Sequence, residues 1–274
     1  MSHNFRKDYA PQISTLTTHK TMRYTFGHTI NAAERLRNIA EFFNPLAAEF
    51  IGNHLKSPVR SATDLGCGPG YTAQMLATVT MAENVTGLDI SDHFISLAKK
   101  QYPEIHFVKQ DLTQWDSAEK YNVLYGRFLL SHLVNREQLL SNWIKHLEPG
   151  GLLFIDELED IYTDIPVFQK YLKMNELLIK SQGAELFVGK LLTHEIRKFR
   201  VVLNQSDIIP VLDFQASGWS YPNTVGIWNE EEIVLNTLTA NERKAISEVL
   251  LEIYKRGKNQ SNITWKMKRI ILTN

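Results

Sequence analysis

The sequence predicts an α/β fold with a seven-stranded, mostly parallel sheet, an antiparallel last strand and helices on both faces. Three observations support this prediction. Short apolar segments alternate with amphipathic segments between residues 61 and 157, which is typical of βαβ units. A glycine-rich stretch, ATDLGCGPGY at 62–71, follows the first of these segments. Residues 263–268 alternate apolar with polar side chains, as in a half-buried antiparallel strand.

The N-terminal residues 1–57 are expected to form a helical cap or lid. Residues 1–28 are polar and irregular, but from Asn31 apolar residues recur at spacings of three and four, which predicts a helix. Pro45 is expected to interrupt this helix, with a second helix following to about residue 51.

Residues 58–274 are expected to form the main domain, which begins with five parallel strands. These strands are predicted at 61–65, 84–90, 105–111, 121–127 and 152–157. Helices are predicted between them at 71–79 and 93–101, the second capped by Ser91. Asn135 is expected to open a further helix, with Gln138 completing a capping box, and the sequence EPGG at 148–151 is expected to end it.

The C-terminal part of this domain is expected to contain a helical insertion at about 158–200. A strand near 198–205, a long helix over about 240–256 and the antiparallel last strand complete the prediction. The aromatic stretch SGWSYPNTVGIW at 217–228 is interpreted as core and turn.

Composition limits the classes of function. Lysine plus arginine and aspartate plus glutamate number 30 each, so the charge gives no footprint of nucleic-acid binding. The single cysteine excludes an intrachain disulfide framework and a multi-cysteine metal site. No signal peptide or membrane span is apparent. We therefore expect a cytoplasmic protein with a small-molecule substrate and with no membrane insertion, nucleic-acid partner or metal.

The ends of the first three strands carry residues suited to one ligand. Glycines in the turn after the first strand let a ligand approach the backbone, but their G-x-G-x-G spacing departs from that of dinucleotide sites. Asp64 suits an ammonium group. Asp89 ends the second strand and suits ribose hydroxyls, and Asp111 follows the third and suits an exocyclic amine. An amino group, a ribose and an adenine together describe S-adenosylmethionine.

With these residues the segment from about 60 to 160 resembles class I S-adenosylmethionine-dependent methyltransferases of the small-molecule type. The matching pieces, in order, are TDLGCGPGYTAQML, VTGLDIS, VKQDL, YGRFLLSHL and LEPGGLLFIDE. The resemblance implies a Rossmann-like fold and methyl transfer that leaves S-adenosylhomocysteine. It also implies a set of cofactor-binding residues: Asp64, Gly66, Cys67, Gly68, Gly70, Asp89, Ile90, Asp111, Leu112 and Arg127.

The acceptor side is less defined. His132 and Glu157 are candidates for a general base, and Tyr24, His28 and His132 are candidates for substrate contacts. The helical segments at 1–50 and 158–200 suggest an apolar or amphipathic metabolite as the acceptor. Two alternatives stay open, namely a non-catalytic S-adenosylmethionine-binding partner or regulatory protein and a nicotinamide-dependent oxidoreductase.

Overall fold

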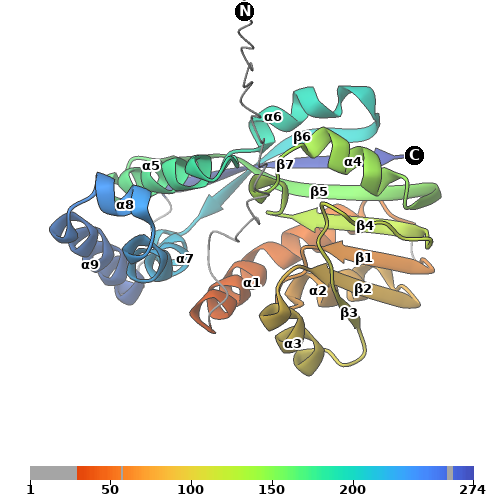
Figure 1. Cartoon of the computed structure of the whole chain (residues 1–274), viewed down its shortest axis with the longest axis horizontal. Coiled ribbons are helices and arrows are strands. Elements are labelled where there is room, and N and C mark those ends of the chain that lie inside the picture. The colour runs from red at the N-terminus through yellow and green to blue at the C-terminus, as the bar shows by residue number, and fades with distance from the viewer. Residues whose placement is uncertain (1–29, 57, 258–261) are drawn as a thin grey trace, which may run out of the picture.

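The computed structural model describes residues 30–56, 58–257 and 262–274, and these contain one seven-stranded sheet (Figure 1). Its strand order is β3-β2-β1-β4-β5-β7-β6. The neighbouring pairs from β3 to β5 are parallel, and β7 is antiparallel to both β5 and β6. The predicted fold class is confirmed. The strands are β1 (Ser61–Leu65), β2 (Asn84–Asp89), β3 (His106–Lys109), β4 (Tyr121–Arg127), β5 (Leu147–Thr163), β6 (Arg200–Val211) and β7 (Ile263–Thr273).

Helices cover both faces of the sheet because successive side chains of each strand point to opposite sides. Leu124, Leu153 and Ile270 pack with α4 and α6 on one face. Their neighbours Val123 and Phe154 pack with α1 and α2 on the other. The helices are α1 (Ile30–Gly52), α2 (Tyr71–Thr80), α3 (Asp92–Gln101), α4 (Arg136–Ile144), α5 (Pro166–Ser181), α6 (Gly189–Glu195), α7 (Asp213–Val225), α8 (Glu232–Thr237) and α9 (Ala240–Arg256).

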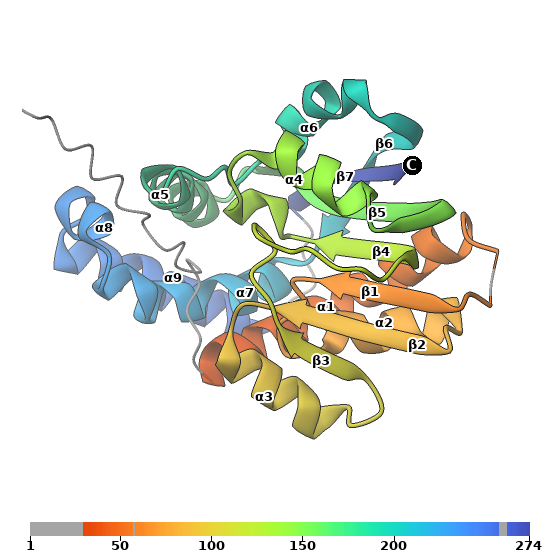
Figure 2. The same cartoon turned by 45° about the vertical axis from the view of Figure 1, so that its right-hand side comes forward.

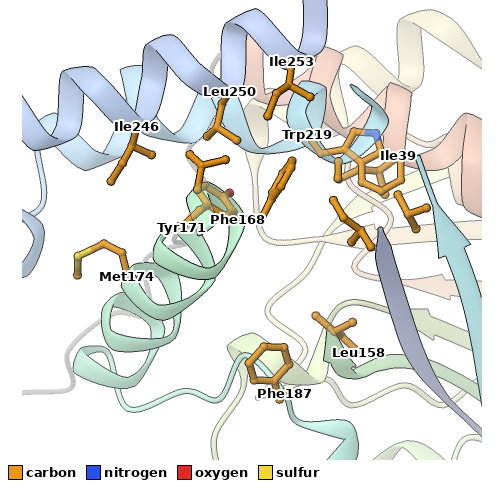
Figure 3. Packing of buried hydrophobic residues seen from close by; sticks show 14 of the residues in the cluster. Ile39, Leu158, Phe168, Tyr171, Met174, Phe187, Trp219, Ile246, Leu250 and Ile253 are labelled. Atoms are coloured by element: carbon orange, nitrogen blue, oxygen red, sulfur yellow. The ribbon is translucent and has the colours of Figure 1, made fainter. Parts of the chain in front are cut away.

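A third apolar cluster joins the far parts of β5 and β7 to a helical lobe. Figures 1 and 2 both place α5, α7, α8 and α9 together beyond one end of the sheet. In Figure 3, Ile246, Leu250 and Ile253 of α9 point towards α5, where Phe168 and Tyr171 face them. This lobe lies beyond the carboxyl ends of the parallel strands, where open α/β sheets bind their ligands.

Strand β5 is longer than predicted at both ends. It begins at Leu147, where Leu147 pairs with Tyr121 across an irregular register, so EPGG lies inside the strand. It ends at Thr163, so residues 158–163 are strand and not part of a helical insertion. The physical reason is β7, which pairs with β5 as far as Thr163 and Ile263.

The prediction that Pro45 divides the N-terminal helix is wrong, because α1 is continuous from Ile30 to Gly52. Pro45 lies on the exposed face beside Glu41, whose carbonyl loses its helical partner and can be hydrated there. On the opposite face Phe43, Ala47 and Ile51 are completely buried. Their burial outweighs the cost of about 3 kcal/mol for an interior proline.

The cap of α3 is confirmed, since the Ser91 side chain accepts a hydrogen bond from the Phe94 N–H. The capping box predicted for α4 is wrong: Asn135 does precede the helix, but in a left-handed conformation without a side-chain cap bond. No helix within the described residues is long and apolar enough to cross a membrane.

Candidate functional site

A cavity of about 490 Å³ lies at the carboxyl ends of the parallel strands, between the sheet, α1 and the helical lobe. One half is formed by the turn after β1 and the residues after β2, β3 and β4, and we call it the strand-end half. The other half is lined mainly by apolar residues of α1, β5, α5, α7 and β7, together with Phe128 of the turn after β4, and we call it the apolar half. The predicted residues that line the cavity are Gly66, Cys67, Gly68, Asp89, Ile90, Asp111, Leu112, Arg127 and His132.

The three glycines of the turn have left-handed backbones, with φ of +72° at Gly66, +51° at Gly68 and +92° at Gly70. Their surroundings differ. Among the described residues, a Cβ added to Gly68 would meet only Leu36, at an ordinary distance of 3.7 Å, and both residues line the cavity. A Cβ added to Gly70 would lie 2.9 Å from Phe107 and 3.0 Å from Tyr102. Gly68 therefore leaves room on the cavity side, whereas Gly70 is required by packing.

Two carboxylates in the strand-end half are held by local hydrogen bonds. Asp89 accepts the Gly68 N–H at 2.9 Å with one oxygen and the Ser91 N–H at 2.8 Å with the other. Asp111 accepts the Thr113 N–H at 2.9 Å and its hydroxyl at 2.7 Å. Both carboxylates are only partly buried and line the cavity, so each is fixed in orientation and can accept further hydrogen bonds.

Asp64 lies just behind the lining. Its side chain is buried and accepts the Thr72 hydroxyl at 2.5 Å. Burial raises the pKa of Asp64 to about 7, against the opposing effects of the Thr72 hydrogen bond and the Arg127 charge.

Arg127 ends β4 and faces the cavity. Its Nη2 donates to the Asn44 side chain at 2.8 Å, while Nη1 is buried without a hydrogen-bond partner among the described residues. Asn44 also donates to the Tyr71 carbonyl at 3.0 Å. This asparagine therefore ties α1 both to the start of α2 and to the end of β4.

Glu157 does not line the cavity. It is buried, and its Oε1 accepts the N–H groups of Leu129 and Leu130, each at 2.7 Å. Burial raises the pKa of Glu157 to about 8. Its neighbour Asp156 is also buried, with an oxygen 3.6 Å from the Arg269 Nε. Glu157 thus holds the turn after β4 in its conformation. Its side chain lies outside the cavity, so it is not positioned to act as a general base on an acceptor.

His132 does line the cavity, in the turn held by Glu157. Burial, followed by the Arg35 charge, lowers the pKa of His132 to about 4. Its imidazole is therefore neutral at neutral pH and able to accept a proton, but the lowered pKa makes it a weaker base than an ordinary histidine. The other substrate candidates, Tyr24 and His28, lie outside the described residues.

Aromatic side chains line the apolar half together with aliphatic ones, and their role was not predicted from the sequence. They are Phe128, Phe168, Tyr171, Trp219 and Trp265. Figure 3 shows Trp219 of α7 beside Ile39 of α1. Trp219 belongs to the stretch interpreted as core and turn, but α7 is a helix that extends to Val225. For Trp265, the alternation of apolar and polar residues at 263–268 was the one sequence signal that its side chain faces the apolar side of a strand.

The strand-end half fits S-adenosylmethionine by the chemistry of its groups. It combines a glycine whose missing Cβ leaves space, two oriented carboxylates and an arginine with a buried nitrogen that has no partner in the described part of the chain. By contrast, the described residues contain no cluster of three or more His, Cys, Asp or Glu that could hold a metal ion.

Comparison with known proteins supports this fit. Residues 62–151 match the model of a family described as methyltransferase domain. A trans-aconitate 2-methyltransferase of Delftia acidovorans is 31% identical over 128 residues, which is 46% of this chain and 47% of that protein. One from Rhizobium leguminosarum bv. trifolii is 31% identical over 97 residues, 35% of this chain and 38% of that protein. The matches thus span less than half the length of these two curated relatives.

Solved structures of methyltransferases share the fold. Coclaurine N-methyltransferase bound to N-methylheliamine and S-adenosylhomocysteine has a TM-score of 0.55 at 17% identity, covering 84% of this chain and 72% of that one. The plantazolicin methyltransferase BpumL with S-adenosylhomocysteine has a TM-score of 0.52 at 20% identity, covering 89% of each chain. The resemblance is confirmed: the chain contains a class I S-adenosylmethionine-dependent methyltransferase domain.

Proposed function

We propose that this protein transfers the methyl group of S-adenosylmethionine to a small, largely apolar acceptor. The observation that carries the proposal is that one continuous cavity joins the strand-end half to the apolar half. A methyltransferase must hold its cofactor and its acceptor side by side, and this cavity offers two adjoining environments of different chemistry.

The strand-end residues would hold the cofactor. Asp89 would accept the ribose hydroxyls, because both of its oxygens are oriented by backbone N–H groups. Asp111 would accept from the adenine amine, and its turn with Thr113 fixes the carboxylate. Arg127 would face the amino-acid end, and Asp64 would act on the same end through its charge from just behind the lining. When bound, S-adenosylmethionine supplies an electrophilic methyl group on a sulfonium.

The apolar half would bind the acceptor and exclude water from it. His132 is the candidate proton acceptor for a hydroxyl because it lines the cavity and its imidazole is neutral, and its lowered pKa suits an acceptor whose proton is already acidic, such as a phenol. A neutral amine as the acceptor would need no such base. Alignment of the acceptor with the methyl group is then the main contribution of the protein.

The apolar half argues against trans-aconitate, the acceptor in the names of the curated relatives. A tricarboxylate needs several cationic partners, but Arg35 and Arg127 are the only lysine or arginine side chains among the described cavity residues. Arg35 Nε already donates to the Trp219 carbonyl at 2.7 Å, and Arg127 is the residue proposed above for the amino-acid end of the cofactor. We therefore propose an acceptor with much less charge.

Calorimetric titration with S-adenosylmethionine, S-adenosylhomocysteine and NADH tests the cofactor. We expect the first two to bind and NADH to give no heat above dilution. NADH binding without the other two would refute the proposal in favour of an oxidoreductase. Release of S-adenosylhomocysteine with a panel of apolar hydroxyl and amine acceptors then tests transfer. Tight cofactor binding without turnover on any acceptor would favour a non-catalytic partner.

A further inference from the structure

Three aromatic rings form a connected wall of the apolar half, which we call the aromatic corner: Phe128, Trp219 and Trp265. The rings come from the turn after β4, from α7 and from β7. Phe43 of α1 packs against all three, with centroid distances of 5.3 Å to Phe128, 5.7 Å to Trp219 and 5.3 Å to Trp265. Phe43 is fully buried and does not line the cavity, so it supports the corner from behind.

The two indoles of the corner are nearly perpendicular. Their centroids are 5.4 Å apart and their planes meet at 81°. A flat ring that lies along one indole presents its edge or face to the other. Aromatic pairs favour offset-stacked and edge-to-face arrangements, so one planar ligand can satisfy both preferences in such a corner. A flexible alkyl chain gains burial there but neither of these ring contacts.

Phe128 is held in the corner against its own backbone preference. Its φ of +52° is uncommon for a residue with a bulky side chain. Its N–H donates to the Asp156 carbonyl at 3.2 Å, and Glu157 fixes the next two N–H groups. A strained conformation persists only where its surroundings enforce it, and such residues cluster at functional sites.

The charges around the corner point to an uncharged ligand. The acidic residues among the described cavity lining are Asp89 and Asp111, and both belong to the strand-end half. A cationic acceptor would therefore have no carboxylate partner in the apolar half. Among the described residues, two guanidinium groups lie at the corner. Arg35 Nε donates to the Trp219 carbonyl. Arg127, whose Cζ lies 5.8 Å from the centroid of the Phe128 ring, is the group proposed above for the amino-acid end of the cofactor.

We propose that the aromatic corner receives a planar, uncharged aromatic or heteroaromatic acceptor and that Phe128 helps to determine this specificity. The inference rests on the proposed function, because it names the substrate class of the same cavity. Phe128 directly follows Arg127, so its ring stands where the apolar half meets the strand-end half.

Binding of model compounds tests the proposal without any turnover. Protein loaded with S-adenosylhomocysteine is titrated with 2-naphthol as a planar probe, 1-decanol as a flexible apolar probe and trans-aconitate as a charged probe. Heat and tryptophan fluorescence are recorded. We expect 2-naphthol to bind with a Kd at least fivefold lower than that of 1-decanol, and trans-aconitate not to bind.

Variants connect this preference to the corner. Phe128→Leu and Trp265→Leu should each weaken 2-naphthol binding by about five- to tenfold, the scale of one lost aromatic contact plus its buried area. Binding of 1-decanol should change little. Tyr162→Leu is the matched control, because Tyr162 lies on β5, is 50% exposed and does not line the cavity. Unchanged affinity for S-adenosylhomocysteine verifies that each variant is folded.

The outcomes separate the two proposals. Equal affinity for 2-naphthol and 1-decanol, or a preference that survives both corner variants, would overturn the aromatic corner and leave methyl transfer intact. Failure of the wild-type protein to bind S-adenosylhomocysteine would overturn the proposed function. The same comparison of probes on the unloaded protein would then still decide whether the corner selects planar ligands.

Discussion

Alanine at Gly68 and alanine at Gly70 should have opposite consequences, although the two glycines are two residues apart. Both have positive φ, so each substitution costs about 1–2 kcal/mol of stability for a left-handed residue with a Cβ. At Gly68 no steric cost adds to this backbone cost, because the nearest described atom that the new Cβ would meet is 3.7 Å away. At Gly70 the contacts of 2.9 to 3.2 Å with Phe107, Tyr102 and Ala98 add overpacking of about 1–3 kcal/mol.

The two variants should rank in the opposite order in their effect on cofactor affinity, with Gly68→Ala the more damaging. The Cβ of Gly68→Ala would project into the strand-end half, next to the N–H that Asp89 accepts, and we expect the affinity for S-adenosylhomocysteine to fall at least tenfold. Gly70→Ala should lower the free energy of unfolding by about 2–5 kcal/mol. The folded variant should bind S-adenosylhomocysteine with nearly the affinity of the wild type. Urea unfolding and calorimetry on both variants measure the two quantities. Wild-type affinity in Gly68→Ala, or equal stability of the two variants, would refute this reading of the turn.

Three further outcomes follow from the acidic residues. Asp89→Ala should weaken S-adenosylmethionine binding by about 1–3 kcal/mol in calorimetry, and unchanged affinity would remove Asp89 from the site. With a pKa of about 7, the ionised fraction of Asp64 rises about tenfold from pH 6 to pH 8, so affinity for S-adenosylhomocysteine should rise over this interval. Asp64→Asn should lack that rise, and an identical pH profile in this variant would contradict the assignment. The raised pKa of Glu157 means that the folded state keeps a proton that the unfolded state has lost, so stability should fall as pH rises from about 4.5 towards 8. Urea unfolding of Glu157→Gln should show a flatter pH dependence, and a slope equal to that of the wild type would exclude Glu157 as a cause.

The fold was predictable where local patterns and packing agree. Strands β1 to β4 are short, apolar and bounded by turns, and each was found from the sequence: β1 and β4 with the predicted bounds, β2 one residue shorter and β3 shorter at both ends. Pro45 was misread because its local cost is outweighed by burial of the face that contains Phe43. The extension of β5 to Thr163 depends on β7, about 100 residues later, and no local pattern reports such a pairing.

The candidate site divides in the same way. The residues of the strand-end half lie at the ends of parallel strands, and these ends meet at one edge of the sheet. The positions of Gly68, Asp89 and Asp111 in the sequence were therefore enough to predict that they lie close together. The aromatic corner combines residues from three distant segments, and only tertiary structure joins them. Glu157 shows a further limit, because an acid that ends a strand can turn inward to hold backbone N–H groups.

The long β5–β7 ribbon has a consequence for how such a protein can diversify. The predicted cofactor contacts lie within residues 64–127, one uninterrupted stretch. The walls of the apolar half come mainly from α1, the ribbon and the helices attached to it, with Phe128 directly after that stretch. Substitutions in these outer segments can change which acceptor fits while the methyl-donor contacts stay intact. A new substrate can therefore evolve without rebuilding the chemistry. Methyltransferases named for molecules as different as coclaurine and plantazolicin share this fold at 17% and 20% identity to the chain.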